Sequence, residues 1–279
     1  IVGTALYQLN ILVDTIFASF SSLVGPGAIA AIYYATRLIQ FPLSIFGHSI
    51  SNASLPTLTE LAAEEKIHKF AEIVEFSLTN ILFVMIPASL GLIVMSQPII
   101  RLLFQRGEFT RYSTAITSTA LAFYAIGLSS YAANKFLALC FNSLHDTITP
   151  VKISALALAL NIILNTFFVI VLKTEIAGLA FASSLSSIAS SVILYKILYK
   201  RIRLIDSKRI VSQFINMLLA GLIMVLVIFI VWQKLSVYKH HILSLVATIC
   251  IGITVYILIS LFLKIYQAIH IFKWMLRKK

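Results

Sequence analysis

Long apolar stretches alternate with short polar ones along the 279 residues of the chain. A helix needs about 20 predominantly apolar residues to cross the hydrocarbon core of a membrane, because each residue adds only about 1.5 Å to its length. Eight stretches are long enough, and the pattern therefore predicts an all-α polytopic membrane protein with eight transmembrane helices. They lie near residues 3–24, 28–58, 71–96, 113–141, 151–172, 175–198, 210–232 and 242–265.

Turn-forming residues separate several of these stretches. Gly25-Pro26-Gly27 lies between the first two, and the polar run 142–150 lies between the fourth and the fifth. The second stretch, 28–58, is too long for one straight crossing. Proline removes a backbone hydrogen bond and clashes with the preceding turn, so Pro42 in the middle of this stretch is expected to kink the helix.

The composition agrees with a membrane protein and changes how the charges are interpreted. Apolar residues make up 60% of the chain and charged residues 11%, with a mean hydropathy of +0.98. Soluble domains carry about a quarter charged residues, so too little polar surface is present to cover a soluble protein. The 22 Lys and Arg against 10 Asp and Glu give a net charge of +12. Because these cations lie between the apolar stretches, they favour a topology signal and argue against nucleic acid as a partner.

The distribution of the cations predicts the orientation of the chain in the membrane. The side that holds both ends carries 14 Lys and Arg, whereas the other side carries 6. Cytoplasmic loops are enriched in Lys and Arg, so both ends are expected in the cytoplasm. Residues 196–209 alone hold six of these cations, next to anionic lipid headgroups. The alternative for this loop is specific recognition of membrane lipids.

Motifs for catalysis are missing from the sequence. It contains no H-E-x-x-H, no G-x-S-x-G and no phosphate-binding glycine loop, so neither an enzyme nor a required cofactor is expected. Cys140 and Cys250 lie within apolar stretches and suggest neither a disulfide nor a metal site. Function is therefore sought among the polar residues that fall inside the predicted spans, since ionisable groups at that depth are costly.

Arg37 lies inside the second span, about 14 Å from its outer end. Other polar side chains fall within about 60° of its direction on a regular helix. They are Tyr33, Gln40, Ser44, His48, Ser51 and Asn52. Such a stripe cannot face lipid, so it either forms a hydrogen-bonded seam with other helices or lines a water-filled cavity. In a cavity Arg37 would bind an anion, because a guanidinium forks onto phosphate or carboxylate.

Two other ionisable residues inside spans each leave two interpretations open. His48 could titrate near neutral pH or simply form hydrogen bonds within a seam. Lys135 lies about seven residues from the cytoplasmic end of the fourth span, so its ammonium either reaches the membrane surface or faces the same cavity.

Several runs of residues carry a family resemblance. They are DTIFASF at 14–20, GAI at 27–29, YYATRL at 33–38, QFP at 40–42, FG at 46–47, LPTL at 55–58, LFQRGEFT at 103–110 and DTITPVK at 146–152. In this order they resemble the MurJ/MviN family of lipid II flippases, within the multidrug/oligosaccharidyl-lipid/polysaccharide flippase superfamily. The first runs are similar to the seventh and eighth helices of that family.

The resemblance implies an architecture. The family has fourteen helices with cytoplasmic termini, arranged as two six-helix lobes and two extra helices, and the eight predicted spans match helices 7–14. Residues 1–200 would then form the second lobe, and residues 201–279 would form two additional transmembrane helices and a basic cytoplasmic tail. The first lobe is expected upstream in the same gene or as a separate chain, so this sequence is interpreted as a C-terminal portion.

The resemblance also implies a function. The family moves undecaprenyl-pyrophosphate-linked disaccharide-pentapeptide, the peptidoglycan precursor, across the bacterial inner membrane by alternating access. The substrate-binding residues would be Arg37, Gln40, Tyr33, Ser44, His48 and Asn52, with the last two spans forming an apolar groove for the polyprenyl tail. Two alternatives stay open: another exporter of the superfamily that moves drugs or another lipid-linked glycan, and a truncated remnant that transports nothing.

The chain departs from the family beside the arginine. Thr36 stands where many relatives have Asp, and Gln40 where some have Glu. Arg37 is therefore less compensated by nearby acids, which puts in doubt a mechanism in which an acidic neighbour releases the substrate.

Asp14 suggests a cation site, because a bare carboxylate about eleven residues into a span would be costly. Asn161 and Asn165 share one face of the fifth span, and Ser183 follows Leu179 by one turn on the sixth. A carboxylate with neutral oxygens suits a hard monovalent cation, and relatives that bind Na⁺ resemble this pattern, although some have Asp at Asn165. The alternative is that the asparagines bridge helices and that Asp14 pairs with Arg37.

Overall fold

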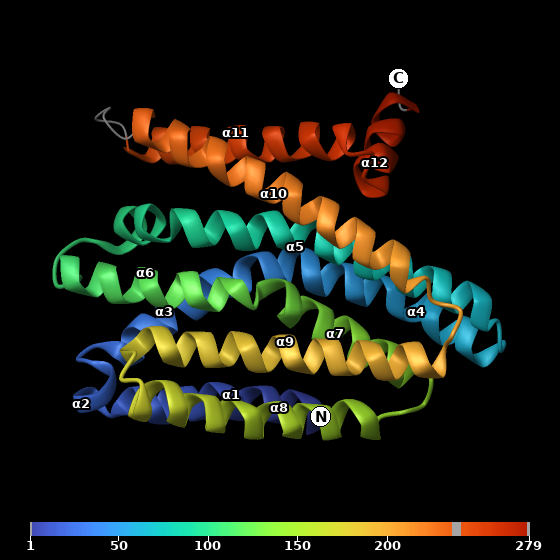
Figure 1. Cartoon of the computed structure of the whole chain (residues 1–279), viewed down its shortest axis with the longest axis horizontal. Helices are drawn as coiled ribbons and strands as arrows, with labels where there is room; N and C mark the ends of the chain where they lie inside the picture. Colours follow the sequence, from blue (N-terminus) through green and yellow to red (C-terminus); the bar gives the residue numbers. More distant parts are fainter. Residues whose placement is uncertain (1, 236–240, 278–279) are drawn as a thin grey trace.

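The computed structural model describes residues 2–235 and 241–277, and every regular element within these ranges is helical. The long helices run side by side along the long axis of the molecule (Figure 1). The elements are α1 (Val2–Ser19), α2 (Ser21–Val24), α3 (Ala28–Pro42), α4 (Ser49–Ala63), α5 (Ile67–Phe104), α6 (Arg111–Ile126), α7 (Leu128–Ser143), α8 (Ile148–Asn165), α9 (Glu175–Arg201), α10 (Ser207–Leu235), α11 (His241–Phe262) and α12 (Tyr266–Arg277), with the π-helical stretches η1 (Leu43–His48) and η2 (Thr166–Val171).

The helical class is confirmed, and the number of spans is confirmed only in part. Six helices in the described ranges are long and apolar enough to cross a membrane, and the bent pair α6–α7 would make a seventh crossing. The predicted span 3–24 forms α1 and α2, which are not among them. Helix α1 contains the polar residues Gln8, Asn10 and Asp14 within the predicted span. Exactly eight spans are therefore not established.

The second predicted span is one long helical segment, 28–63, whose hydrogen-bond pattern changes in its middle. Pro42 ends α3 and is followed at once by the π-helical stretch η1, after which α4 continues. Proline cannot donate its backbone hydrogen bond, so the wider turn begins where that donor is missing. A π-turn takes more residues than an α-turn, and residues after it are rotated relative to those before it.

The fourth predicted span, 113–141, is divided into two helices. Residues 111–126 and 128–143 meet at Gly127 with a bend of 45°. A side chain at Gly127 would come within 2.9 Å of the Ser184 backbone and of the Tyr131 ring. Only a glycine lets the bend of α6–α7 approach α9 this closely, and the sequence pattern of apolar residues carries no trace of it.

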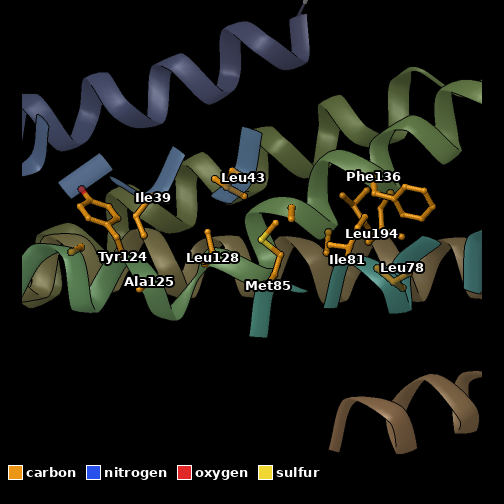
Figure 2. Close-up of a cluster of buried hydrophobic side chains, with 14 of the residues drawn as sticks. Ile39, Leu43, Leu78, Ile81, Met85, Tyr124, Ala125, Leu128, Phe136 and Leu194 are labelled. Atoms are coloured by element: carbon orange, nitrogen blue, oxygen red, sulfur yellow. The ribbon is translucent and has the colours of Figure 1, made fainter. Parts of the chain in front are cut away.

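Two hydrophobic cores hold the helices together in the part of the chain that the structure describes. The larger core includes Ile39 from α3, Met85 from α5 and Leu128 from α7, and Figure 2 shows these side chains meeting between their helices. The smaller core packs α10 and α11 against α5 around Met217 and Met224. Helix α5 contributes to both cores, so it joins the two regions of the molecule.

A proline inside α5 helps to fix α11. Because Pro87 has no backbone N–H, the carbonyl of Phe83, four residues earlier, loses its helical donor. The Tyr256 hydroxyl of α11 donates to this Phe83 carbonyl at 2.9 Å, and the two rings pack at 5.3 Å between centroids. The polar end of a buried tyrosine thus replaces the hydrogen bond that the proline removes.

The predicted basic tail contains a further helix. Helix α12 lies across the direction of the long helices in Figure 1. The His270 ring lies 6.3 Å from that of Phe76 on α5, and the Arg209 guanidinium of α10 stacks over the Tyr266 ring at 5.3 Å. The tail is therefore folded against α5 and α10.

Candidate functional site

Asp14 lies at the centre of a buried polar cluster that joins four helices. Its side chain is 4% exposed and accepts hydrogen bonds from three neutral donors. Ser183 of α9 donates to Oδ2 at 2.5 Å, Tyr124 of α6 donates to the same oxygen at 3.1 Å, and Asn165 of α8 donates to Oδ1 at 3.0 Å. We refer to Asp14, Tyr124, Asn161, Asn165 and Ser183 as the Asp14 cluster.

The two asparagines complete the cluster. Asn161 and Asn165 are both fully buried, and the Asn165 amide donates to Asn161 Oδ1 at 3.1 Å. The Asn161 amide in turn donates to Ser183 Oγ at 3.0 Å. The structure therefore brings together the four side chains that the spacing on three separate spans predicted. Leu179, the fifth predicted member, is fully buried one turn before Ser183.

The same contacts overturn one alternative from the sequence, a pair between Asp14 and Arg37. Within the part of the chain that the structure describes, Asp14 makes no ion pair and is held by the three neutral donors. Arg37 instead lies on an exposed face of α3 with its guanidinium 5.1 Å from the centre of the Tyr33 ring. The two residues are on adjacent helices, but their side chains point to different surroundings.

One atom of the cluster has the property expected of a cation ligand. The side-chain oxygen of Asn165, Oδ1, is buried and accepts no hydrogen bond. An unsatisfied buried acceptor costs about 1–3 kcal/mol, and a bound cation would remove that cost. The Asn165 side-chain oxygen, the Asp14 carboxylate and the Ser183 hydroxyl are kinds of oxygen that a hard cation could use as ligands, and the Leu179 backbone carbonyl is of the same kind.

The polar stripe around Arg37 forms an open face. Tyr33 is 54% exposed, and Arg37, Ser44 and Asn52 are also exposed. Gln40 and His48 are partly buried. These six predicted substrate-binding residues follow one side of the segment that contains α3, η1 and α4. The exposed members, Tyr33, Arg37, Ser44 and Asn52, are not covered by other helices in the described part of the chain, so this part of the stripe is not a closed interhelical seam there.

One residue of the predicted stripe is turned away from it. Ser51 is fully buried, and its hydroxyl donates to the Gly47 carbonyl at 2.7 Å. The prediction assumed a regular rotation of about 100° per residue, which fails across η1 because π-turns are wider.

A pocket lies beside the Tyr33 end of the stripe. It has a volume of about 550 Å³ and lies between the end of α1 and the start of α3. Its lining includes Ser19, Gly25, Gly27, Tyr33 and Tyr34. Arg37 is one helical turn further along α3, so an anion held by its guanidinium would have space for an attached group toward this pocket.

Three further residues lie in or near these sites. Thr36, which replaces the acid of many relatives, donates its hydroxyl to the Ile32 carbonyl at 2.8 Å and leaves Arg37 without an acidic neighbour there. Tyr124 was missed entirely, because an aromatic residue in an apolar stretch gives no signal that its hydroxyl reaches a carboxylate. Lys135 is partly buried on α7.

Comparison with known proteins connects the chain to a family. Residues 1–275 match the family model described as Lipid II flippase MurJ. The probable lipid II flippase MurJ of Vibrio cholerae is 36% identical over 194 residues, which is 70% of this chain and 36% of that protein. The one from Buchnera aphidicola subsp. Acyrthosiphon pisum is 32% identical over 242 residues, covering 86% of this chain and 46% of that protein. The chain spans about half the length of these relatives or less.

Solved structures support the same connection. A lipid II flippase MurJ in an inward closed conformation superposes with a TM-score of 0.77 and 28% identity, covering 94% of this chain and 52% of that one. An outward-facing multidrug resistance transporter of the MATE family has a TM-score of 0.59 and 16% identity, covering 93% of this chain and 62% of that one. The second likeness concerns the fold alone.

Proposed function

The chain belongs to the MurJ family of lipid II flippases, and we propose that it forms the C-terminal part of such a flippase. The substrate is undecaprenyl-pyrophosphate-linked disaccharide-pentapeptide, carried across the bacterial inner membrane with both ends of this chain in the cytoplasm. Residues 1–200 act as the second lobe, and residues 201–279 add two membrane helices and a basic tail that meets anionic lipids. A first lobe, in the same chain or a separate one, completes the cavity.

The observation that supports this function best is the uncovered polar stripe on a helix of an apolar protein. Exposed Arg37, Ser44 and Asn52 would be costly against lipid, so a partner surface or water must lie opposite them. A first lobe would place a water-filled cavity there. Arg37 then forks onto the pyrophosphate, because a guanidinium matches phosphate geometry with two parallel hydrogen bonds.

The polyprenyl tail would follow α10 and α11. Outward-facing apolar residues cover these helices, including Leu226 at 63%, Phe229 at 52% and Leu258 at 58% exposure. A hydrocarbon chain binds such a surface without requiring hydrogen bonds from it. Rocking of the two lobes around the bound headgroup would expose the cavity to either side of the membrane in turn.

Complementation tests this function. Cells depleted of their own lipid II flippase receive this chain alone, this chain with the first lobe of a relative, or the same pair carrying Arg37→Ala. We expect growth only with the unaltered pair. If the pair is well expressed in the membrane and still fails to support growth and to move labelled lipid II, the chain is either an exporter of another substrate or a remnant that transports nothing.

We further propose that the Asp14 cluster binds Na⁺, for which the unpartnered Asn165 oxygen is the supporting observation. Na⁺ should raise the thermal midpoint of the purified chain relative to choline at equal ionic strength. Asp14→Asn should abolish this increment, because it removes the negative charge while keeping the shape of the side chain. An increment that survives Asp14→Asn unchanged would show that the cluster is only a hydrogen-bonded seam.

A further inference from the structure

Two adjacent serines on α9 face two different features of the molecule. Ser183 donates to the Asp14 carboxylate, while Ser184 lies at the bend between α6 and α7. There the Ser184 hydroxyl accepts from the Gly127 backbone N–H at 3.1 Å and donates to the Phe123 carbonyl at 2.6 Å. The bend is therefore fastened to the same turn of α9 that holds the carboxylate.

Tyr124 makes the second connection between the cluster and the bend. It lies on α6 three residues before Gly127, is 4% exposed, and points its hydroxyl at Asp14 Oδ2. In the cluster, Ser183 and the asparagines come from α9 and α8, so Tyr124 is the member that comes from the bent helix pair. Its ring lies in the larger core together with Ile39, two residues after Arg37 on α3 (Figure 2).

We propose that Tyr124 is a positioning residue of the Asp14 cation site and that it transmits cation occupancy to the bend at Gly127. This inference rests on the Na⁺ site proposed above. The Tyr124 hydroxyl donates to Oδ2, which leaves Oδ1 oriented toward the side-chain amide of Asn165. Because α6 also packs along α3, a shift of α6 caused by a change at Asp14 would also displace the helix that carries Arg37.

The physical basis is reciprocal coupling between a ligand and two arrangements of a helix pair. A cation that draws Asp14 toward Asn165 changes the hydrogen bond from Tyr124, and Tyr124 cannot move without α6. The cation then favours the arrangement of α6–α7 in which this bond forms. By reciprocity, a change that favours this arrangement must tighten cation binding by the same factor. Ser184 limits the response to the bend, since it holds the α6–α7 junction against α9.

The test compares the full purified chain with Tyr124→Phe and with Tyr256→Phe as a matched control. Both variants lose one buried, hydrogen-bonded tyrosine hydroxyl, but the Tyr256 hydroxyl bonds Phe83 in the other core. Thermal midpoints are measured in choline and during a Na⁺ titration. Tyr124→Phe should raise the Na⁺ concentration at half-maximal stabilisation roughly tenfold, the loss expected for a hydrogen bond to a charged group. Tyr256→Phe should lower the midpoint in choline and leave the Na⁺ response unchanged.

Hydrogen exchange measured by mass spectrometry provides the readout of coupling. In the parent chain, Na⁺ should slow exchange both in peptides of α8 and α9 and in peptides across 111–143. In Tyr124→Phe at saturating Na⁺, protection should remain in α8 and α9 and be lost across the bend. A parent response that persists unchanged in Tyr124→Phe by both measurements overturns this inference alone. Absence of any Na⁺ response in the parent chain overturns the proposed cation site together with it.

Discussion

The two polar sites of this chain differ in how much of each the chain supplies. In the Asp14 cluster, a buried carboxylate meets donors from α6, α8 and α9, so its negative end is satisfied internally. Along the Arg37 stripe, the charged group has an aromatic ring beside it and otherwise an open face. The comparison teaches that a polar group within an apolar protein is either held by donors of its own chain, as at Asp14, or left facing outward, as at Arg37. Held by its own chain, the Asp14 cluster supports stability and leaves one unpartnered oxygen for a small ion. The open face at Arg37 is accessible to a large ligand.

The largest effect on function is expected from a substitution at Arg37, on the open stripe. Arg37→Lys keeps the charge but loses the two-pronged geometry, so it should reduce transport almost as much as Arg37→Ala, by roughly a hundredfold or more. The thermal midpoint of the purified chain should hardly change, because the side chain is exposed. The measurement is lipid II movement in cells that also contain a first lobe. Normal transport by Arg37→Lys would show that a positive charge without specific phosphate geometry suffices.

The opposite pattern is expected at Asp14. Asp14→Leu leaves the Tyr124, Asn165 and Ser183 donors buried without their acceptor, so the free energy of unfolding should fall by about 3 kcal/mol. Equilibrium unfolding in detergent measures the loss, with Asn52→Leu on the open stripe as the exposed control. Equal destabilisation by the two variants would contradict the distinction between a completed site and an open one.

A smaller loss of stability is expected at Tyr256, whose hydroxyl makes a buried hydrogen bond within the smaller core. Tyr256→Phe removes one neutral hydrogen bond to the Phe83 carbonyl and should cost about 1 kcal/mol. Pro87→Ala, which restores a backbone donor to that carbonyl, should make the loss of the Tyr256 hydroxyl less costly. Additive effects of Tyr256→Phe and Pro87→Ala in a double-mutant cycle would show that the tyrosine does not replace the missing helical bond.

The smallest effect is expected from a charge outside the spans. The pKa of Asp146 is lowered. The largest cause is a hydrogen bond from the Thr149 backbone N–H, and the Thr149 hydroxyl and the Arg201 guanidinium lower it further. The contribution of Asp146 to stability is therefore complete above the ordinary aspartate pKa of about 4 and is lost as the pH falls through the lowered value. The difference in thermal midpoint between the parent and Asp146→Asn should shrink between pH 6 and pH 2. A difference that grows on acidification would reverse the assigned sign.

A good part of the fold and of the Asp14 cluster follows from the sequence. Apolar runs near the length of a membrane crossing predict most of the long helices, because hydrocarbon excludes unpaired backbone groups. The i, i+4 spacing of Asn161 and Asn165 places both on one face whatever surrounds them. Turn residues such as Gly25-Pro26-Gly27 mark where helices end. These features depend on residues close together in the chain, so a single sequence contains them.

The tertiary structure alone decided several other contacts between these local features. Tyr124 joins Asp14 across 110 positions in the chain, and no local pattern encodes that contact. The bend at Gly127 depends on the approach of Ser184 from α9, and the turning away of Ser51 depends on the π-helical stretch after Pro42. The choice between pairing Asp14 with Arg37 and satisfying it with neutral donors also lay beyond the sequence. The contact of Tyr124, the bend at Gly127 and the surroundings of Asp14 depend on how the helices pack in three dimensions, whereas the position of Ser51 depends on a change of helix type that the apolar pattern does not reveal.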